Sequence, residues 1–115
     1  MKTDGRIAAT VKQVVQWLVE KDYKSLVAHT RGARIDEGQI ELAIRRYGRT
    51  LVMPPESAWA STDIVEISGV DPHSWSVQFD LWTREEGRSD LTVELTLTEN
   101  NQDLLDARLE DLRVL

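Results

Sequence analysis

Two segments in the second half of the chain alternate between apolar and polar residues, and this pattern constrains the fold more than any other feature. In "SWSVQFDLW" the apolar positions are Trp75, Val77, Phe79 and Leu81. In "DLTVELTLT" the apolar positions are Leu91, Val93, Leu95 and Leu97. Because successive side chains of a strand point to opposite faces, both segments are predicted to be β-strands with one buried face. Thr92 and the other polar positions are expected to face outward.

The link between these strands, "TREEGRS", gathers charges around Gly87 and is predicted to be the tip of a hairpin. Two further strands are expected. The segment "TDIVEIS" at residues 62–68 is short and β-branched. The last strand begins near Leu105, and a shift in its apolar phase predicts a bulge near Glu110 and Asp111.

The first half is predicted to be helical. Its first helix has an apolar stripe at helical spacing, formed by Ile7, Val11, Val14, Val15 and Leu18. Thr3 or Asp4 can cap this helix, and a short second helix is expected between Asp22 and Gly32. The third has a capping box at Asp36 and Gln39 and ends at Gly48. The segment "RTLVMPPESAWA" is expected to be a connector, because two adjacent prolines exclude a regular helix or a central strand.

Together these elements predict one α+β domain over residues 1–115, with three N-terminal helices packed on a curved antiparallel sheet of about four strands. The opening "VVQWLVEKDYKSLVAHT" is similar to the start of NTF2-like and cystatin-like folds. The chain has no cysteine, which excludes disulfides and thiolate chemistry. It also has no signal peptide or apolar run that would span a membrane, so we expect a cytoplasmic protein.

The charge is unevenly distributed. Residues 1–55 carry ten Lys/Arg and six Asp/Glu, whereas residues 56–115 carry four and fourteen. The halves therefore carry +4 and −10, which add to the net charge of −6. A negative chain is not suited to general nucleic-acid binding, and the acidic second half favours a basic protein partner.

Three segments, "YGRTLVMPPE", "LWTREEGRSDLTVELTLTE" and "LEDLRVL", resemble a bacterial family of small uncharacterised proteins that share a domain of unknown function. The resemblance extends over most of residues 14–115 and implies no catalytic residues. In size, acidity and layout the chain is also similar to immunity proteins of contact-dependent growth inhibition systems.

Catalytic and cofactor sites are not expected. His29 and His73 lack the ligand spacing of a metal centre, and the residues of "DPHS" are too close in sequence to form a Ser–His–Asp triad. Glu85 and Glu86 could form a carboxylate pair, but a charged, solvated hairpin tip is the simpler interpretation. Trp82 falls on the polar face, where it is either an exposed anchor for a partner or is covered by a bulge or by the connector.

The outward carboxylates of the two long strands have few basic neighbours in the sequence. The preferred hypothesis is therefore an immunity protein whose acidic sheet occludes the active site of a basic, nuclease-type toxin. The residues predicted to bind this partner are Asp80, Trp82, Glu85, Glu86, Asp90 and Glu94. The alternative is a ligand-binding or enzymatic domain with a pocket between helices and sheet, lined by Tyr47, Trp59 and His73.

Overall fold

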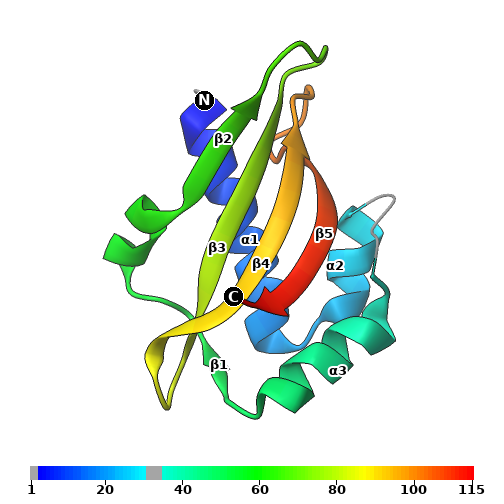
Figure 1. The fold of residues 1–115 in the computed structure, drawn as a ribbon. Coiled ribbons are helices and arrows are strands. Elements are labelled where there is room, and N and C mark those ends of the chain that lie inside the picture. Colours follow the sequence, from blue (N-terminus) through cyan, green and yellow to red (C-terminus); the bar gives the residue numbers. More distant parts are fainter. Residues whose placement is uncertain (1–2, 31–34) are drawn as a thin grey trace.

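Three helices precede a five-stranded antiparallel sheet in the computed structural model (Figure 1). The structure describes residues 3–30 and 35–115, with side chains from Gly5 onward. The elements in chain order are α1 (Thr3–Glu20), α2 (Tyr23–His29), α3 (Glu37–Tyr47), β1 (Leu51–Val52), the 3₁₀ helix η1 (Glu56–Ser61), β2 (Asp63–Ile67), β3 (Ser74–Thr83), β4 (Gly87–Thr98) and β5 (Asp106–Val114). The predicted α+β layout is therefore confirmed. The expected caps at Thr3 or Asp4 and the expected stop at Gly32 lie outside the described side chains.

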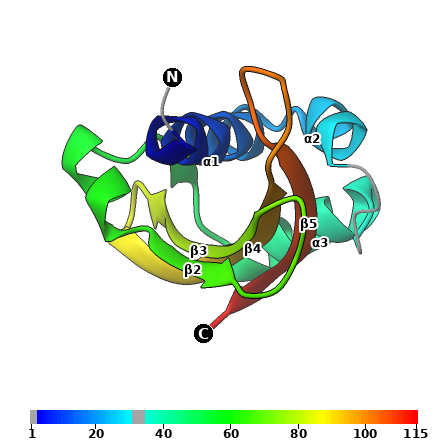
Figure 2. The same cartoon turned by 90° about the horizontal axis from the view of Figure 1, so that it is seen from above.

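The sheet curls around α1, which lies against its concave face (Figure 2). Strand β3 is central: it pairs with β4 along one edge, and β4 pairs with β5. Along its other edge β3 pairs with two strands, β1 near its C-terminal end and β2 near its N-terminal end. The connector was thus only partly predicted, because it contains a two-residue strand and the helix η1 on either side of Pro54 and Pro55.

The apolar stripe of α1 and the apolar positions of the strands form the core. The buried residues include all five of the predicted stripe positions and the strand residues Trp75, Val77, Phe79, Leu81, Leu91, Val93, Leu95 and Leu97. Burying side chains of this size stabilises a fold by roughly 1.5–3 kcal/mol each. Thr92 is the exception to the predicted outward exposure. It lies on the convex face but is only 1% exposed, because side chains of that face cover it.

Local signals place the shorter elements correctly. The amide of Gln39 donates to the Asp36 carboxylate at 2.8 Å, and the amide of Asp36 donates to the Gln39 side chain at 2.8 Å. This is the predicted capping box at the N-terminus of α3, and α3 lies beside β5. The bulge is also where it was predicted, because Glu94 pairs with Asp111 while the next residue, Leu95, pairs with Leu109 and leaves Glu110 between them.

Candidate functional site

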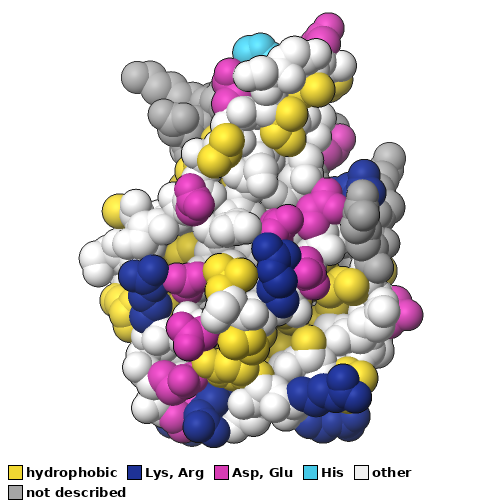
Figure 3. Space-filling model, viewed as in Figure 1, with side chains coloured by type: hydrophobic (Ala, Val, Ile, Leu, Met, Phe, Trp, Pro, Cys, Tyr) yellow, Lys and Arg dark blue, Asp and Glu magenta, His cyan; other side chains and the backbone are white. Residues whose placement is uncertain are grey.

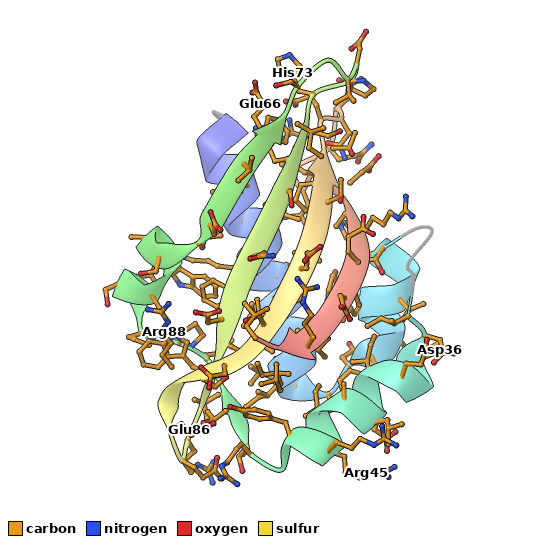
Figure 4. The ribbon with its side chains drawn as sticks, in the orientation of Figure 1. Asp36, Arg45, Glu66, His73, Glu86 and Arg88 are labelled. Atoms are coloured by element: carbon orange, nitrogen blue, oxygen red, sulfur yellow. The ribbon has the colours of Figure 1, made fainter. Side chains whose placement is uncertain are left out.

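The six predicted partner-binding residues all lie on the β3–β4 hairpin, but they do not form one surface. Glu85 and Glu86 lie at the tip, which Figure 4 shows at the end of the sheet opposite Glu66 and His73. Asp80 and Trp82 belong to β3, and Asp90 and Glu94 belong to β4. The structure divides them into a tip anchored to the helical half, a cleft around Trp82 and a set of ion pairs on the convex face.

Glu85 holds the hairpin tip against the segment that follows α3. Its carboxylate accepts hydrogen bonds from the amide of Thr50 at 2.8 Å and from the Thr50 hydroxyl at 2.9 Å. These bonds, with the charge of Arg49, lower the pKa of Glu85 below its ordinary value. A carboxylate held in the ionised form is a poor general acid, so this geometry supports an anchoring role.

Glu86 anchors the tip to α3. It accepts a hydrogen bond of 2.9 Å from the Tyr47 hydroxyl and one of 3.2 Å from the hydroxyl of Thr83. The Tyr47 hydroxyl also accepts a hydrogen bond of 3.4 Å from the backbone amide of Asp90. The predicted hairpin tip is therefore present, with Gly87 at φ +76°, and its two carboxylates both bind groups of the same molecule.

Trp82 lies half-buried at a cleft between η1 and β3. The cleft has a volume of about 290 Å³ and is lined by Ser57, Ala58, Ser61, Phe79, Asp80, Trp82 and Arg88. The cleft lies beside the part of β3 between its pairing partners β1 and β2, so η1 rather than a strand flanks the sheet there. Of the two expectations for Trp82, full exposure is not observed, because the residue is half-buried and packs against the core at a shift in the β3–β4 register between Asp80 and Trp82.

Asp80 is paired with an arginine that was not among the predicted residues. The guanidinium of Arg88 lies 2.8 Å from the Asp80 carboxylate, and the Arg88 Nε donates to the same oxygen at 2.9 Å. The other carboxylate oxygen of Asp80 accepts a hydrogen bond of 2.8 Å from the hydroxyl of Thr92. Trp82 pairs directly with Arg88 across the strands, so the indole lies beside this ionic network rather than beside a bare carboxylate.

Glu94 is also neutralised. Arg113 of β5 lies 2.8 Å from Glu94 and 3.0 Å from Asp111, and these two carboxylates raise the pKa of Arg113. The expectation that the outward carboxylates have few basic neighbours is therefore wrong. Opposite charges alternate over the convex face, as Figure 3 shows. The charge pairs come from cross-strand register, which brings residues far apart in sequence together.

The three side chains predicted to line a pocket are far apart. Tyr47 binds the hairpin tip, and Trp59 of η1 stacks on Phe79 with ring centroids 5.0 Å apart. His73 lies in the β2–β3 turn at the opposite end of the sheet (Figure 4). The predicted lining is therefore wrong, because the space between α1 and the sheet is filled by the apolar core. Among the described residues, no group of three or more His, Asp or Glu side chains is arranged to hold a metal ion.

A different cavity, of about 370 Å³, lies between the helices and β1. Its lining comprises Leu18, Val19, Lys21, Tyr23, Glu41, Ile44, Arg45, Gly48, Arg49, Thr50 and Leu51. Three cations therefore surround an apolar floor, and Glu41 lies 3.6 Å from Arg45. Burial and the charge of Glu41 raise the pKa of Tyr23. The basic sequence around Arg45 and Arg49 was the available signal for this cavity, but only the arrangement of α1, α3 and β1 around it shows that it is concave.

Comparison with known proteins identifies the family of this chain but assigns no activity to it. No curated protein and no solved structure matches the chain. In the described part of the chain, no helix is both long enough and apolar enough to cross a bilayer. Residues 15–115 match a family described as Domain of unknown function (DUF7668). This range contains the hairpin, the Trp82 cleft and the basic cavity, and the chain belongs to that family.

Proposed function

We propose that this chain is a cytoplasmic immunity protein that binds a basic toxin domain and blocks its active site. The observation that carries the proposal is the Trp82 cleft, in which a partly accessible indole is surrounded by polar and charged side chains. An aromatic anchor with a polar rim is the usual centre of a protein interface. The acidity of residues 56–115 favours a partner with a basic surface.

The ion pairs on the convex face refine the mechanism. Since Asp80 and Glu94 already bind arginines, they contribute less to long-range attraction than unpaired carboxylates would. Their role in this proposal is to orient the partner after encounter, because a basic side chain of the toxin can share the carboxylates with Arg88 and Arg113. The hydrogen bonds of Glu85 and Glu86 hold the hairpin tip in place. This surface is therefore already ordered, and little conformational entropy is lost on binding.

The test uses the product of the neighbouring gene as the candidate toxin. Its activity should be blocked by an equimolar amount of the wild-type protein. The Trp82→Ala variant should dissociate at least about tenfold faster, because a desolvated anchor acts after encounter. The Val114→Ala variant, which removes an apolar side chain that is 57% exposed on β5, is the control and should bind like the wild type. Unchanged kinetics for Trp82→Ala would exclude this cleft, and an uninhibited toxin would exclude the function.

The basic cavity supports a second candidate, in which the chain binds a small anion with an apolar body. Its floor of Leu18, Ile44 and Leu51 suits a short hydrocarbon chain, and Lys21 with Arg49 suits a carboxylate or phosphate. Titration with octanoate tests this candidate. Arg49→Gln should weaken binding severalfold, whereas Arg46→Gln, on the same helix end but outside the lining, should not. Octanoate that fails to bind, or binds equally to both variants, would remove this candidate.

A further inference from the structure

Strand β2 is the most exposed element of the sheet, although it is rich in apolar residues. All five of its residues are exposed. The accessible apolar side chains are Ile64 at 44%, Val65 at 58%, Ile67 at 37% and, in the following turn, Val70 at 42%. Figure 3 shows apolar and acidic groups together on the end of the molecule that protrudes here. A cluster of exposed apolar side chains of this kind is a recognised mark of an interaction site.

The outer edge of β2 offers backbone groups for pairing. Its register with β3 runs without a bulge from Asp63 opposite Gln78 to Ile67 opposite Ser74. Within the described residues no strand pairs with its other edge. Alternate N–H and C=O groups of an edge strand point away from the sheet. Edge strands are commonly protected by lysine, proline, a bulge or a covering segment, and β2 itself contains no lysine, proline or bulge.

The negative charge around the outer edge of β2 indicates which kind of polypeptide segment can pair with it. Residues 50–83 contain no lysine or arginine but five carboxylates, and Asp63, Glu66 and Asp71 of these lie exposed on β2 and its turn. Glu66 is labelled at this end in Figure 4. A second copy paired through β2 would bring the carboxylates of both copies together without compensating cations, which opposes self-association. A segment carrying Lys or Arg would instead be attracted by this negative charge.

We propose that β2 accepts an extended segment of another protein, in which β-branched residues alternate with Lys or Arg, as an additional antiparallel strand. Backbone hydrogen bonds would supply affinity, and side chains on both faces would supply selectivity. On the convex face the segment meets Asp63, Val65 and Ile67, and on the concave face it meets Ile64 and Glu66. Because the cations of an alternating segment share one face, they lie beside either Asp63 or Glu66, depending on which face of the segment is convex. This surface is separate from the Trp82 cleft, so the inference does not depend on the partner being a toxin.

The experiment uses a synthetic peptide, acetyl-Lys-Val-Arg-Ile-Lys-Val-Thr-amide, N-methylated at every second residue so that it keeps one hydrogen-bonding edge and does not self-assemble. We expect binding by fluorescence anisotropy that weakens with salt, and slower hydrogen exchange at residues 63–67. A peptide with the same side chains but N-methylated at every residue lacks the N–H donors, and it should bind at least about tenfold more weakly.

Two variants locate the site. Val65→Lys should weaken peptide binding at least about tenfold, because it places a cation at the edge that faces the basic segment, and Val65 is exposed enough for the fold to tolerate the change. Asp63→Asn combined with Glu66→Gln should weaken binding and reduce its salt dependence. Asp103→Asn, an exposed carboxylate between β4 and β5 and outside the patch, is the matched control.

Three outcomes would overturn the proposal. The peptide fails to bind at millimolar concentration, it binds equally well to Val65→Lys, or it binds equally well when every amide is methylated. A wild-type dimer that Val65→Lys dissociates would also overturn it, because the occupant would then be a second copy. Loss of toxin binding in Trp82→Ala with intact peptide binding would separate the two surfaces and leave this inference standing.

Discussion

The phenol hydroxyl of Tyr47 donates a hydrogen bond of 2.9 Å to a carboxylate oxygen of Glu86, and so joins the end of α3 to the tip of the β3–β4 hairpin. The two residues are 39 positions apart in the chain. The same hydroxyl accepts a hydrogen bond from the backbone amide of Asp90, which lies beyond the turn. One side chain from the helical half therefore contacts both the turn and the strand β4 that follows it.

Replacing Tyr47 by phenylalanine should reduce the free energy of unfolding by about 0.5–1.5 kcal/mol, since one hydrogen bond is lost while the ring remains. Urea denaturation measures the change. Glu86→Gln and the double variant complete a double-mutant cycle. If the bond contributes as the geometry indicates, the losses of the two single variants are not additive. Fully additive losses would show that the two side chains stabilise the fold independently.

The Glu85 carboxylate makes stability depend on pH. Hydrogen bonds from Thr50 lower its folded-state pKa, so its stabilising contribution is complete above the unfolded-state pKa and is lost as pH falls through the folded-state pKa. Glu85→Gln should therefore reduce stability at pH 7 and make the decrease in stability on acidification smaller than in the wild type. Urea midpoints at pH 7 and pH 3 test this. Glu20→Gln, on the surface of α1, controls for the change in net charge. Equal pH dependence of the wild type and Glu85→Gln would contradict the assignment.

Gly87 closes the hairpin with a positive φ of 76°. A Cβ there would find space, since the nearest ring atom of Trp82 is 3.7 Å away, so the cost of substitution is conformational. Gly87→Ala should destabilise the protein by about 1–2 kcal/mol, and Gly87→Asn by less, because asparagine tolerates this region better. Gly38→Ala is the matched control. It lies inside α3 at negative φ and should be neutral or stabilise by up to about 1 kcal/mol. Thermal unfolding would distinguish the three variants.

Much of the fold was readable from the sequence, because its signals are local. The period of the α1 stripe, the capping box at Asp36 and the phase shift near Glu110 each involve residues close together in the chain, and each was located correctly. The alternation of β3 and β4 identified the buried face for the same reason. These patterns follow from backbone geometry, which does not depend on which elements become neighbours.

The candidate site was harder to predict because it depends on neighbours that are distant in sequence. Arg113 reaches Glu94 only once β5 pairs with β4 in a defined register. The hydroxyl of the buried Thr92 finds its partner, the carboxylate of Asp80, only on the neighbouring strand. The cleft beside Trp82 forms only once η1 lies along β3, and the two prolines suggested only that the connector is irregular. Alternation identifies the face of a strand, but it does not identify what covers that face.

Arg6 ties α1 to the loop between β4 and β5. Its guanidinium donates to the Glu99 carboxylate, to the carbonyl of Asn100 at 2.9 Å and to the carbonyl of Gln102 at 2.7 Å. The Arg6 side chain is only 11% exposed, so its loss leaves several acceptors with reduced access to water. Arg6→Ala should lower the free energy of unfolding by about 1.5–3 kcal/mol, the range for hydrogen bonds to charged groups.

Arg6→Lys distinguishes charge from geometry at this position. Lysine keeps the positive charge but lacks the planar fork that contacts three residues of the loop at once, so it should recover only part of the loss. Hydrogen exchange of residues 99–105 should be faster in both variants, and faster in Arg6→Ala. Lys12→Ala is the control on the same helix. It removes an ion pair of 2.7 Å with Glu56, but both side chains are exposed, so the loss should be smaller and the loop should exchange at the wild-type rate. Full recovery in Arg6→Lys would show that Arg6 acts through its charge alone and that the fork does not order the loop.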